Sequence, residues 1–284
     1  MVTVVNGNKI ASQILQKLVQ QVKILKKKKI TPNLGVILVG QDKPSQTYVR
    51  KKGEACQKIG VNFILKKYPA GISTEKLINQ LKLIQKKEKL SGLIIQMPLP
   101  RQIKTNKVLE YLNPKIDVDC LTEKNLGKLI SGSYQLEPPT PGAILEVLRY
   151  HKINLVGQRV VLIGAGSLIG RPLANLLFLK KATVTVCNSS TKKIKEITRQ
   201  ADILITGVGK YNLIRGTMIK KGVKIVDAGV SFYQGKMYGD INFKEVKKKA
   251  SLVTPTPGGV GLITVAKLIE NVVKNAQYLY GKNK

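Results

Sequence analysis

Hydrophobic positions in the first half of the chain alternate between helical spacing and short apolar runs. Residues 9–25 carry apolar side chains every three or four positions, which predicts an amphipathic helix. Residues 34–39 form a continuous apolar run, which is typical of a buried strand. The alternation then predicts a helix at 46–59 capped by Ser45, a strand at 62–68, a helix at 73–87 and a strand at 93–96. This order predicts a mainly parallel sheet with helices on both faces.

The second half of the chain predicts another series of parallel strands. Residues 160–163 form an apolar run that glycines interrupt, and Pro172 then opens an apolar helix over 173–179. Further elements of this series are strands at 182–186, 201–206, 224–226 and 252–253 and a last amphipathic helix at 263–280. Each strand ends in a loop of small residues, and the carboxyl ends of parallel strands form the edge where such sheets bind ligands.

The chain between the two series predicts a connection between two domains. Residues 137–142, EPPTPG, indicate a stiff linker, and a helix is expected at 143–151. His151 is the only histidine and lies at a helix end, where a cation is favourable, so we do not expect it to act in catalysis. The fold class is therefore α/β with two domains, residues 1–119 and 120–284, and the last helix is expected to pack back on the first domain.

The turn between the strand at 160–163 and the following helix is typical of a phosphate-binding loop. Backbone N–H groups at a glycine turn lie at the positive end of the helix dipole. The spacing Gly164-x-Gly166-x-x-x-Gly170 has one residue more than the usual dinucleotide fingerprint, and a glycine turn can also serve as a turn alone. A conventional NAD site carries an acidic residue after the next strand. The side chains available here to bind a 2′-phosphate instead are Ser189, Ser190 and Thr191, with Lys192 or Lys193 nearby.

Five side chains in the first half are candidates for substrate chemistry. Tyr48 and Lys52 are four residues apart and share one helix face, although a solvated lysine beside a half-buried tyrosine would show the same spacing. Gln96 closes a strand, where it either caps a loop or, beside Lys52, orients the amine without adding charge. Asp117 and Asp119 lie on the same side of an extended segment. They predict either an acceptor pair for ligand N–H groups, or a helix cap or loop hydrogen bond.

The charge of the chain raises the possibility of nucleic-acid binding. There are 49 basic and 16 acidic residues, a formal charge of +33, but only 7 of the basic residues are arginine. Phosphate and base recognition favour the arginine fork, the lysines are spread along nearly the whole chain, and no platform of aromatic and basic residues is present. Specific nucleic-acid binding is therefore not expected. The positive field should attract polyanionic small ligands and lower the pKa of buried lysines.

The remaining composition predicts a cytoplasmic enzyme. The sequence has no apolar run long enough to span a bilayer, and its start lacks the order of a signal peptide. Cys56, Cys120 and Cys187 are widely spaced and show no metal-binding pattern, so we expect reduced thiols and no metal site.

Motifs along essentially the full length carry a resemblance to a known family. In chain order they read VGQDKPSQTYVRKKGEACQKIG, GLIIQMPLP, IDVD, PPTPGAILEVL, VLIGAGSLIGRPLANLL, ATVTVCNSSTKK, ADILITGVGK, VKIVDAGV, GDINF and TPTPGGVGLITVAKLIEN. Together they resemble the bifunctional methylenetetrahydrofolate dehydrogenase/cyclohydrolase family.

The resemblance implies a fold, an activity and partners. It implies an N-terminal folate-binding catalytic domain and a C-terminal Rossmann-like NAD(P)-binding domain with a cleft between them, normally in a homodimer. An oxidoreductase step passes hydride from 5,10-methylenetetrahydrofolate to the nicotinamide. A hydrolase step opens the methenyl product to 10-formyltetrahydrofolate. Such an enzyme serves cytoplasmic one-carbon metabolism and purine biosynthesis.

Roles can be carried over by matching positions to the family's motifs. Lys52 matches the catalytic lysine, Gln96 its partner, Tyr48 the tyrosine that packs on the folate, and Asp119 the carboxylate that holds the pterin N–H groups. The residues that border both ligands match Gly258, Gly259 and Val260. The positions expected to bind the cofactor are Gly164, Ala165, Gly166, Ser167, Ile169, Gly170, Ser189, Ser190, Thr191, Gly207, Val208, Gly209 and Val230.

Several positions depart from the family's usual residues. Ala165 and Ser190 stand where arginines are expected to pair with the 2′-phosphate of NADP. The cofactor expected is therefore NADP, with NAD possible, and Arg171 or Lys192 are candidates for compensation. Changes expected to affect packing only are Cys120 for glycine, Pro139 for cysteine and Leu262-Ile263 for Pro-Met.

Two other functions stay open from the sequence. A different Rossmann oxidoreductase, acting on an amino acid or hydroxy acid, would leave Lys52 and Gln96 without a shared role. A basic nucleic-acid-binding protein would show steep salt dependence and no competition by folates.

Overall fold

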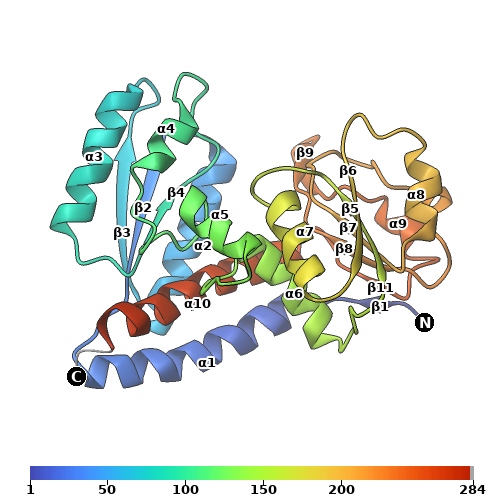
Figure 1. The fold of residues 1–284 in the computed structure, drawn as a ribbon, viewed down its shortest axis with the longest axis horizontal. Coiled ribbons are helices and arrows are strands. Elements are labelled where there is room, and N and C mark those ends of the chain that lie inside the picture. Colours follow the sequence, from blue (N-terminus) through green and yellow to red (C-terminus); the bar gives the residue numbers. More distant parts are fainter. Residues whose placement is uncertain (282–284) are drawn as a thin grey trace. The chain divides into compact units, whose positions relative to one another are not determined.

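The computed structural model describes residues 1–281, which pack into two compact units (Figure 1). The three-stranded unit comprises Ser12–Pro139 and the chain from Val265 onward, and the six-stranded unit comprises Met1–Ala11 and Thr140–Thr264. The units divide after Pro139, whereas the sequence predicted a boundary between residues 119 and 120. The segment between these two positions is held by Asn271, whose side chain donates to the carbonyls of Val118 and Glu137 at 3.0 and 2.8 Å.

The three-stranded unit is built on a parallel sheet in the order β3-β2-β4. Its strands are β2 (Asn33–Val39), β3 (Asn62–Tyr68) and β4 (Gly92–Ile95). Its helices are α1 (Gly7–Lys27), whose first turn belongs to the other unit, α2 (Lys43–Ile59), α3 (Thr74–Lys87), α4 (Thr105–Glu110), α5 (Glu123–Ile130) and most of α10 (Val260–Tyr280). The strands that the sequence predicted in this unit are present within a residue of the expected bounds.

The core of this unit lies between the sheet and the helices that cover it. Ile37 of β2 and Leu93 of β4 pack with Leu77 and Leu81 of α3 in one fully buried cluster. The C-terminal helix closes the unit through buried polar side chains: Asn275 donates to the carbonyls of Ser91 and Lys115 at 2.6 and 2.7 Å.

The six-stranded unit contains a parallel sheet in the order β1-β11-β8-β7-β5-β6. Its strands are β1 (Thr3–Val4), β5 (Arg159–Ile163), β6 (Thr183–Cys187), β7 (Ile203–Thr206), β8 (Lys224–Asp227) and β11 (Leu252–Val253). A separate hairpin pairs β9 (Ser231–Tyr233) with β10 (Lys236–Tyr238). The helices are α6 (Pro139–Tyr150), α7 (Gly170–Leu179), α8 (Ile194–Gln200), the 3-10 turn η1 (Gly216–Met218) and α9 (Phe243–Val246). The sheet confirms the predicted Rossmann-like class, but β1, β9 and β10 are too short to give a periodic signal and were missed.

Four predicted helix starts are wrong. The last helix, α10, begins at Val260 rather than at residue 263. α2 begins at Lys43 because Asp42, not Ser45, is the cap: its carboxylate accepts the Ser45 N–H at 2.9 Å. α6 begins at Pro139, so most of the predicted stiff linker is helical, which suits proline in a first helical turn. α7 begins at Gly170 rather than after Pro172.

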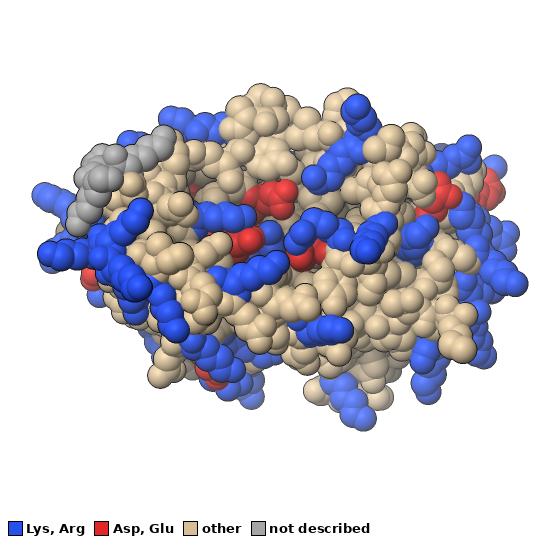
Figure 2. Space-filling view, turned by 90° about the horizontal axis from the view of Figure 1, so that it is seen from below, with Lys and Arg blue, Asp and Glu red and all other residues tan. Residues whose placement is uncertain are grey.

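Basic side chains are scattered over the visible surface rather than gathered in one patch (Figure 2). This distribution agrees with the expectation of a general positive field. In the described part of the chain, no helix is both long and apolar enough to cross a membrane.

Truncating Asn275 tests the role of the C-terminal helix in the three-stranded unit. Asn275→Ala leaves two buried carbonyls without their donor, so we expect the free energy of unfolding to fall by about 1–3 kcal/mol. Gln277→Ala, an exposed position on the same helix, should leave it unchanged. Urea denaturation followed by circular dichroism measures both, and equal midpoints would contradict the assigned role.

Candidate active site

Helix α2 carries the central amine of the candidate site. Tyr48 and Lys52 lie one turn apart on it, and both side chains are partly buried. The helix is fixed at both ends, by the Asp42 cap and by Gly60, whose φ of 78° allows the left-handed turn that ends it. The position of the amine is therefore set by a rigid element.

Gln96 presents its carbonyl oxygen to this amine. It follows β4, and its backbone N–H donates to the Ile37 carbonyl at 2.9 Å, which extends the strand ladder. Its side-chain N–H donates to the Met97 carbonyl at 2.8 Å, so the amide oxygen faces Lys52 and accepts from Nζ at 2.9 Å. The strand order thus brings together the two residues that the sequence could only suggest as partners.

Burial and a nearby carboxylate act on the pKa of the central amine in opposite directions. Burial is the main cause that lowers the pKa of Lys52, and the nearby Asp119 opposes it by raising that pKa. Burial raises the pKa of the Asp119 carboxyl, against the charge of Lys52. Burial also raises the pKa of Tyr48, which stays a neutral phenol. Gln96 accepts a hydrogen bond from the amine but carries no negative charge. A negative charge there would hold the proton on Lys52.

The glycine turn of the six-stranded unit has the geometry of a close backbone approach. Gly164 ends β5 with φ 115°, a left-handed conformation that favours glycine. A Cβ at Gly170, the first residue of α7, would overlap the Gly164 carbonyl, whereas a Cβ at Gly166 would meet open space. Ala165 and Gly166 are at least partly exposed, and the predicted positions Ser167 and Ile169 complete the turn. The turn therefore leaves room for a phosphate at the start of a helix.

Hydrogen bonds inside the loop after β6 involve Thr191 and leave the Ser189 and Ser190 hydroxyls unused. The Thr191 hydroxyl oxygen accepts the Asn188 N–H at 2.9 Å, and the Asn188 side chain accepts the Ser190 N–H at 2.9 Å. Thr191 therefore shapes the turn. The hydroxyls of Ser189 and Ser190 are exposed and have no partner among residues 1–281.

The remaining predicted cofactor positions follow the next two strands. Gly207, Val208 and Gly209 come directly after β7, and Val230 follows β8, which pairs with β7. Gly209 has φ 70° and lies close to the Val230 carbonyl. Because β5, β6, β7 and β8 run parallel, these loops and the glycine turn lie along one edge of the sheet.

Comparison with known proteins matches both halves of the chain to one family. Residues 5–119 match the family described as tetrahydrofolate dehydrogenase/cyclohydrolase, catalytic domain, and residues 138–280 match its NAD(P)-binding domain. The bifunctional protein FolD of Nautilia profundicola is 42% identical, with 97% of each chain covered. The chain belongs to the tetrahydrofolate dehydrogenase/cyclohydrolase family.

Solved structures of this family share the fold closely. The bifunctional FolD of Campylobacter jejuni has a TM-score of 0.95 at 38% identity, covering 98% of this chain and 100% of that one. The Trypanosoma brucei enzyme, solved with NADP cofactor and an inhibitor, has a TM-score of 0.94 at 33% identity and covers 98% of each chain.

The predicted carboxylate pair of this family member divides into two separate roles. Asp117 is 1% exposed and accepts from the N–H groups of Leu121 and Thr122, at 3.1 and 2.8 Å, and from the Asn125 amide at 3.0 Å. It therefore organises the loop before α5, whose cap is Thr122, so the loop hydrogen-bond alternative holds for Asp117. The expected extended segment is a turn. Asp119 is partly exposed and accepts no hydrogen bond from residues 1–281, so its oxygens are free for ligand N–H groups.

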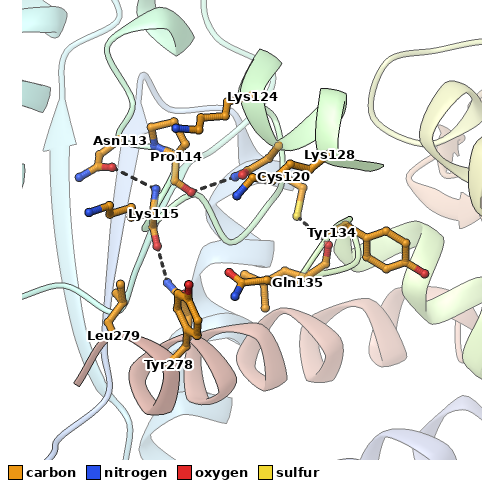
Figure 3. A pocket seen from close by; sticks show the side chains of 13 residues that line it. Asn113, Pro114, Lys115, Cys120, Lys124, Lys128, Tyr134, Gln135, Tyr278 and Leu279 are labelled. Atoms are coloured by element: carbon orange, nitrogen blue, oxygen red, sulfur yellow. Dashed lines mark hydrogen bonds between the residues drawn. The ribbon is translucent and has the colours of Figure 1, made fainter. Parts of the chain in front are cut away.

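Cys120 stands where the resemblance predicts glycine, and its backbone conformation is one that favours glycine. Its φ is 57°, in the left-handed region where a side chain is unfavourable. Its buried thiol donates to the Leu136 carbonyl at 3.5 Å, in the wall of a cavity of about 440 Å³ (Figure 3). Lys52 and Gln96 do not line this cavity, which is therefore distinct from the candidate site.

The other predicted substrate positions lie in the six-stranded unit. The Gly258 carbonyl accepts the Gly7 N–H at 2.9 Å, and Gly259 packs against the same first turn of α1. Val260 begins α10 and is 3% exposed. Gly258 and Gly259 thus shape the loop before α10, and Val260 has little surface left for a ligand.

Two functional candidates were missed from the sequence, the buried carboxylates Asp227 and Asp240. Both contact the loops after β7 and β8. The signal was present, because two acidic residues recur in the motifs VKIVDAGV and GDINF of an acid-poor chain. Across residues 1–281 no group of three His, Cys, Asp or Glu side chains could hold a metal ion.

Removing the charge of Asp119 tests the electrostatics around Lys52. Because the carboxylate raises the pKa of Lys52, Asp119→Asn should lower that pKa further. NMR titration of the Lys52 side chain, labelled at Cε and Nζ, measures the shift. Glu54→Gln removes an exposed carboxylate from the same helix and should leave the Lys52 pKa unchanged. A Lys52 pKa that is identical in Asp119→Asn and wild type would contradict the assigned interaction.

Proposed function

We propose that this chain oxidises 5,10-methylenetetrahydrofolate to 5,10-methenyltetrahydrofolate with NAD(P)⁺ and then hydrolyses the product to 10-formyltetrahydrofolate. Membership of the family and the ten matching motifs support the reaction class. The observation that carries the proposal is the hydrogen bond from the buried Lys52 amine to Gln96, with Asp119 close by. The alternative of an unrelated Rossmann oxidoreductase gives this arrangement no role.

The three-stranded unit supplies the folate site in this proposal. The Asp119 oxygens accept the N–H groups of the pterin ring, and Tyr48 packs against the folate and positions it. The partly exposed faces of these residues leave them open to a ligand. The substrate-binding roles of Gly258, Gly259 and Val260 stay predictions from the family resemblance.

The oxidation step needs positioning more than acid or base chemistry. The nicotinamide, when bound, accepts the hydride from the one-carbon bridge. The residues of the chain hold and orient the reactants and exclude water, which are the main contributions a protein makes to such a step. No side chain has to gain or lose a proton.

The hydrolysis step needs a proton acceptor, and Lys52 is proposed to fill this role. A neutral Lys52 amine takes a proton from the water that attacks the methenyl carbon. The bond from this carbon to N5 then breaks and its electron pair goes to N5. The new C–OH group loses its proton as it becomes the formyl C=O on N10. N5 takes up one of the two protons released from the water, and the other leaves to solvent. Gln96 keeps the amine in place without charge. Burial makes the neutral amine accessible, so the rate of ring opening should fall as the pH decreases through the Lys52 pKa.

The six-stranded unit fits a dinucleotide at the edge formed by its glycine turn. The open space at Gly166 and the close contact of Gly170 with Gly164 are what a backbone cradle for phosphate requires. Ala165, Ser189 and Ser190 would face the ribose end, and Gly207, Val208, Gly209 and Val230 the other loops of the same edge. Arg171, whose Nε donates to the Ala165 carbonyl at 3.1 Å, is the cation nearest to the turn in the hydrogen-bond pattern.

The enzyme is proposed to discriminate only weakly between NADP and NAD. Charge-assisted hydrogen bonds contribute about 1.5–3 kcal/mol each. The two positions expected to supply them to the 2′-phosphate hold the uncharged residues Ala165 and Ser190. A homodimer, a cytoplasmic location and a contribution to purine biosynthesis are implied by the family resemblance and stay predictions.

Replacing Lys52 tests the hydrolysis mechanism. Lys52→Met keeps the length of the side chain but removes the base, so ring opening of methenyltetrahydrofolate should slow by about 10²- to 10⁴-fold. The decay of methenyltetrahydrofolate absorbance measures the rate, and circular dichroism checks the fold. Lys58→Met, an exposed lysine on the same helix, should retain full activity. Undiminished turnover of Lys52→Met would refute the role.

Cofactor kinetics test the predicted weak discrimination between NADP⁺ and NAD⁺. We expect kcat/KM values for NADP⁺ and NAD⁺ within roughly tenfold of each other, about 1.4 kcal/mol. Ala165→Arg should shift the ratio toward NADP⁺ by about tenfold or more, since a charge-assisted pair is restored. Ala165→Gln, of similar length but uncharged, should not. A strong NADP⁺ preference of the wild type would mean that other groups bind the 2′-phosphate.

A further inference from the structure

The loop after β7 is wrapped around a buried carboxylate. Asp240 is 0% exposed, and its two oxygens accept the N–H groups of Val208 and Lys210 at 2.8 and 2.7 Å. The backbone of Gly209 hydrogen-bonds to the same side chain. Three consecutive peptide units of this loop are thus oriented by one side chain that lies 30 to 32 residues further along the chain.

A second buried carboxylate holds Asp240 in place. Asp227, at the end of β8, is 1% exposed and accepts from the Gly229 N–H at 2.9 Å, the Thr206 hydroxyl at 2.8 Å and the Ile241 N–H at 3.2 Å. Thr206 and Asp227 are register partners in the sheet. The carboxylate therefore joins the ends of β7 and β8 to the segment that carries Asp240.

Glycines allow this close packing. A Cβ at Gly229 would overlap the Asp240 carboxyl group, and a Cβ at Gly239 would overlap an oxygen of Asp227. The carboxyl groups of Asp240 and Asp227 therefore fill the space that a Cβ at Gly229 or Gly239 would need. The loops at 207–210, 228–230 and 239–241 form one connected frame.

The frame is stabilised without cations. No Lys or Arg among residues 1–281 forms an ion pair with Asp227 or Asp240, although 49 basic residues are present in the chain. Burial, together with the neighbouring Asp240, raises the pKa of Asp227 to about 6. Two adjacent buried acids are costly unless hydrogen bonds compensate them, and here all of the compensation comes from N–H and O–H groups of the loops.

We propose that Asp240, braced by Asp227, is a positioning residue that holds the 207–210 loop in its dinucleotide-binding shape. The inference rests on the proposed function, because Gly207, Val208, Gly209 and Val230 are the positions assigned to the cofactor. Asp240 itself is fully buried and does not touch the dinucleotide. It acts through the directions of the loop's peptide groups.

The two activities of the enzyme supply an internal control. Oxidation needs the dinucleotide, whereas ring opening of methenyltetrahydrofolate does not. A defect in the loop should weaken dinucleotide binding and raise its KM, with ring opening measured without dinucleotide unchanged. A general loss of structure would reduce both activities together.

The test uses Asp240→Asn and Gly229→Ala in the full chain. In Asp240→Asn, an amide N–H replaces a carboxylate oxygen and faces a backbone N–H of the loop. In Gly229→Ala, the added Cβ displaces the Asp240 carboxylate without removing its charge. Isothermal titration with NADP⁺ and NAD⁺ should give Kd values about tenfold weaker for both variants, which corresponds to about 1.4 kcal/mol. The matched control is Asp202→Asn. Asp202 accepts from the Arg159 N–H and from Lys220 just before β7, at the other end of the same strand, and dinucleotide affinity should not change.

Each outcome decides between specific claims. Affinities equal to wild type in Asp240→Asn and Gly229→Ala overturn this inference alone. A parallel loss of dinucleotide binding and ring opening in both variants means that the pair supports only the fold, and it also overturns the inference. A wild-type chain that binds neither dinucleotide but opens methenyltetrahydrofolate overturns the dehydrogenase part of the proposed function, and the inference with it. Weaker binding with unchanged ring opening supports it.

Discussion

The site depends on a buried amine whose hydrogen-bond partner carries no charge. A carboxylate in the place of Gln96 would hold the proton on Lys52, and an apolar residue would leave the amine without orientation. The amide of Gln96 avoids both effects, because the Met97 carbonyl takes its N–H and leaves its oxygen for Lys52. The nearby Asp119 opposes the effect of burial and raises the pKa of Lys52. The rigid placement of α2 and β4 serves this contact.

The same principle governs the buried acids of this basic chain. Asp117, Asp227 and Asp240 are nearly inaccessible to water, and each is compensated by uncharged N–H and O–H groups, backbone N–H groups among them, rather than by lysine. A buried carboxylate that accepts several N–H groups fixes the directions of several peptide units at once. Acidic residues are therefore used here to shape loops, and the large excess of lysine stays at the surface.

Close backbone approaches set a second constraint, on the nucleotide side. Gly170 lies against the Gly164 carbonyl, and Gly229 and Gly239 lie against carboxyl groups, so larger residues at these positions would push loops apart. Cys120 shows the opposite case, a left-handed position where the family's glycine is replaced and a side chain is accommodated in a buried wall. Some glycines are needed because another group lies too close for a Cβ, and others because the backbone has a positive φ. Only the three-dimensional structure separates the two cases.

The sequence by itself determined the class of fold, the longer strands and helices, the glycine turn and the family, because apolar periodicity and short motifs are local properties. It also placed Tyr48 and Lys52 on one helix face. Only the tertiary structure decided that Gln96 turns its oxygen to Lys52, that Asp117 holds a loop while Asp119 stays open, and that Thr191 belongs to its own turn. It also revealed the contacts of Asp227 and Asp240. These outcomes depend on which donors packing brings to each side chain, often from segments distant along the chain, and no local pattern encodes that choice.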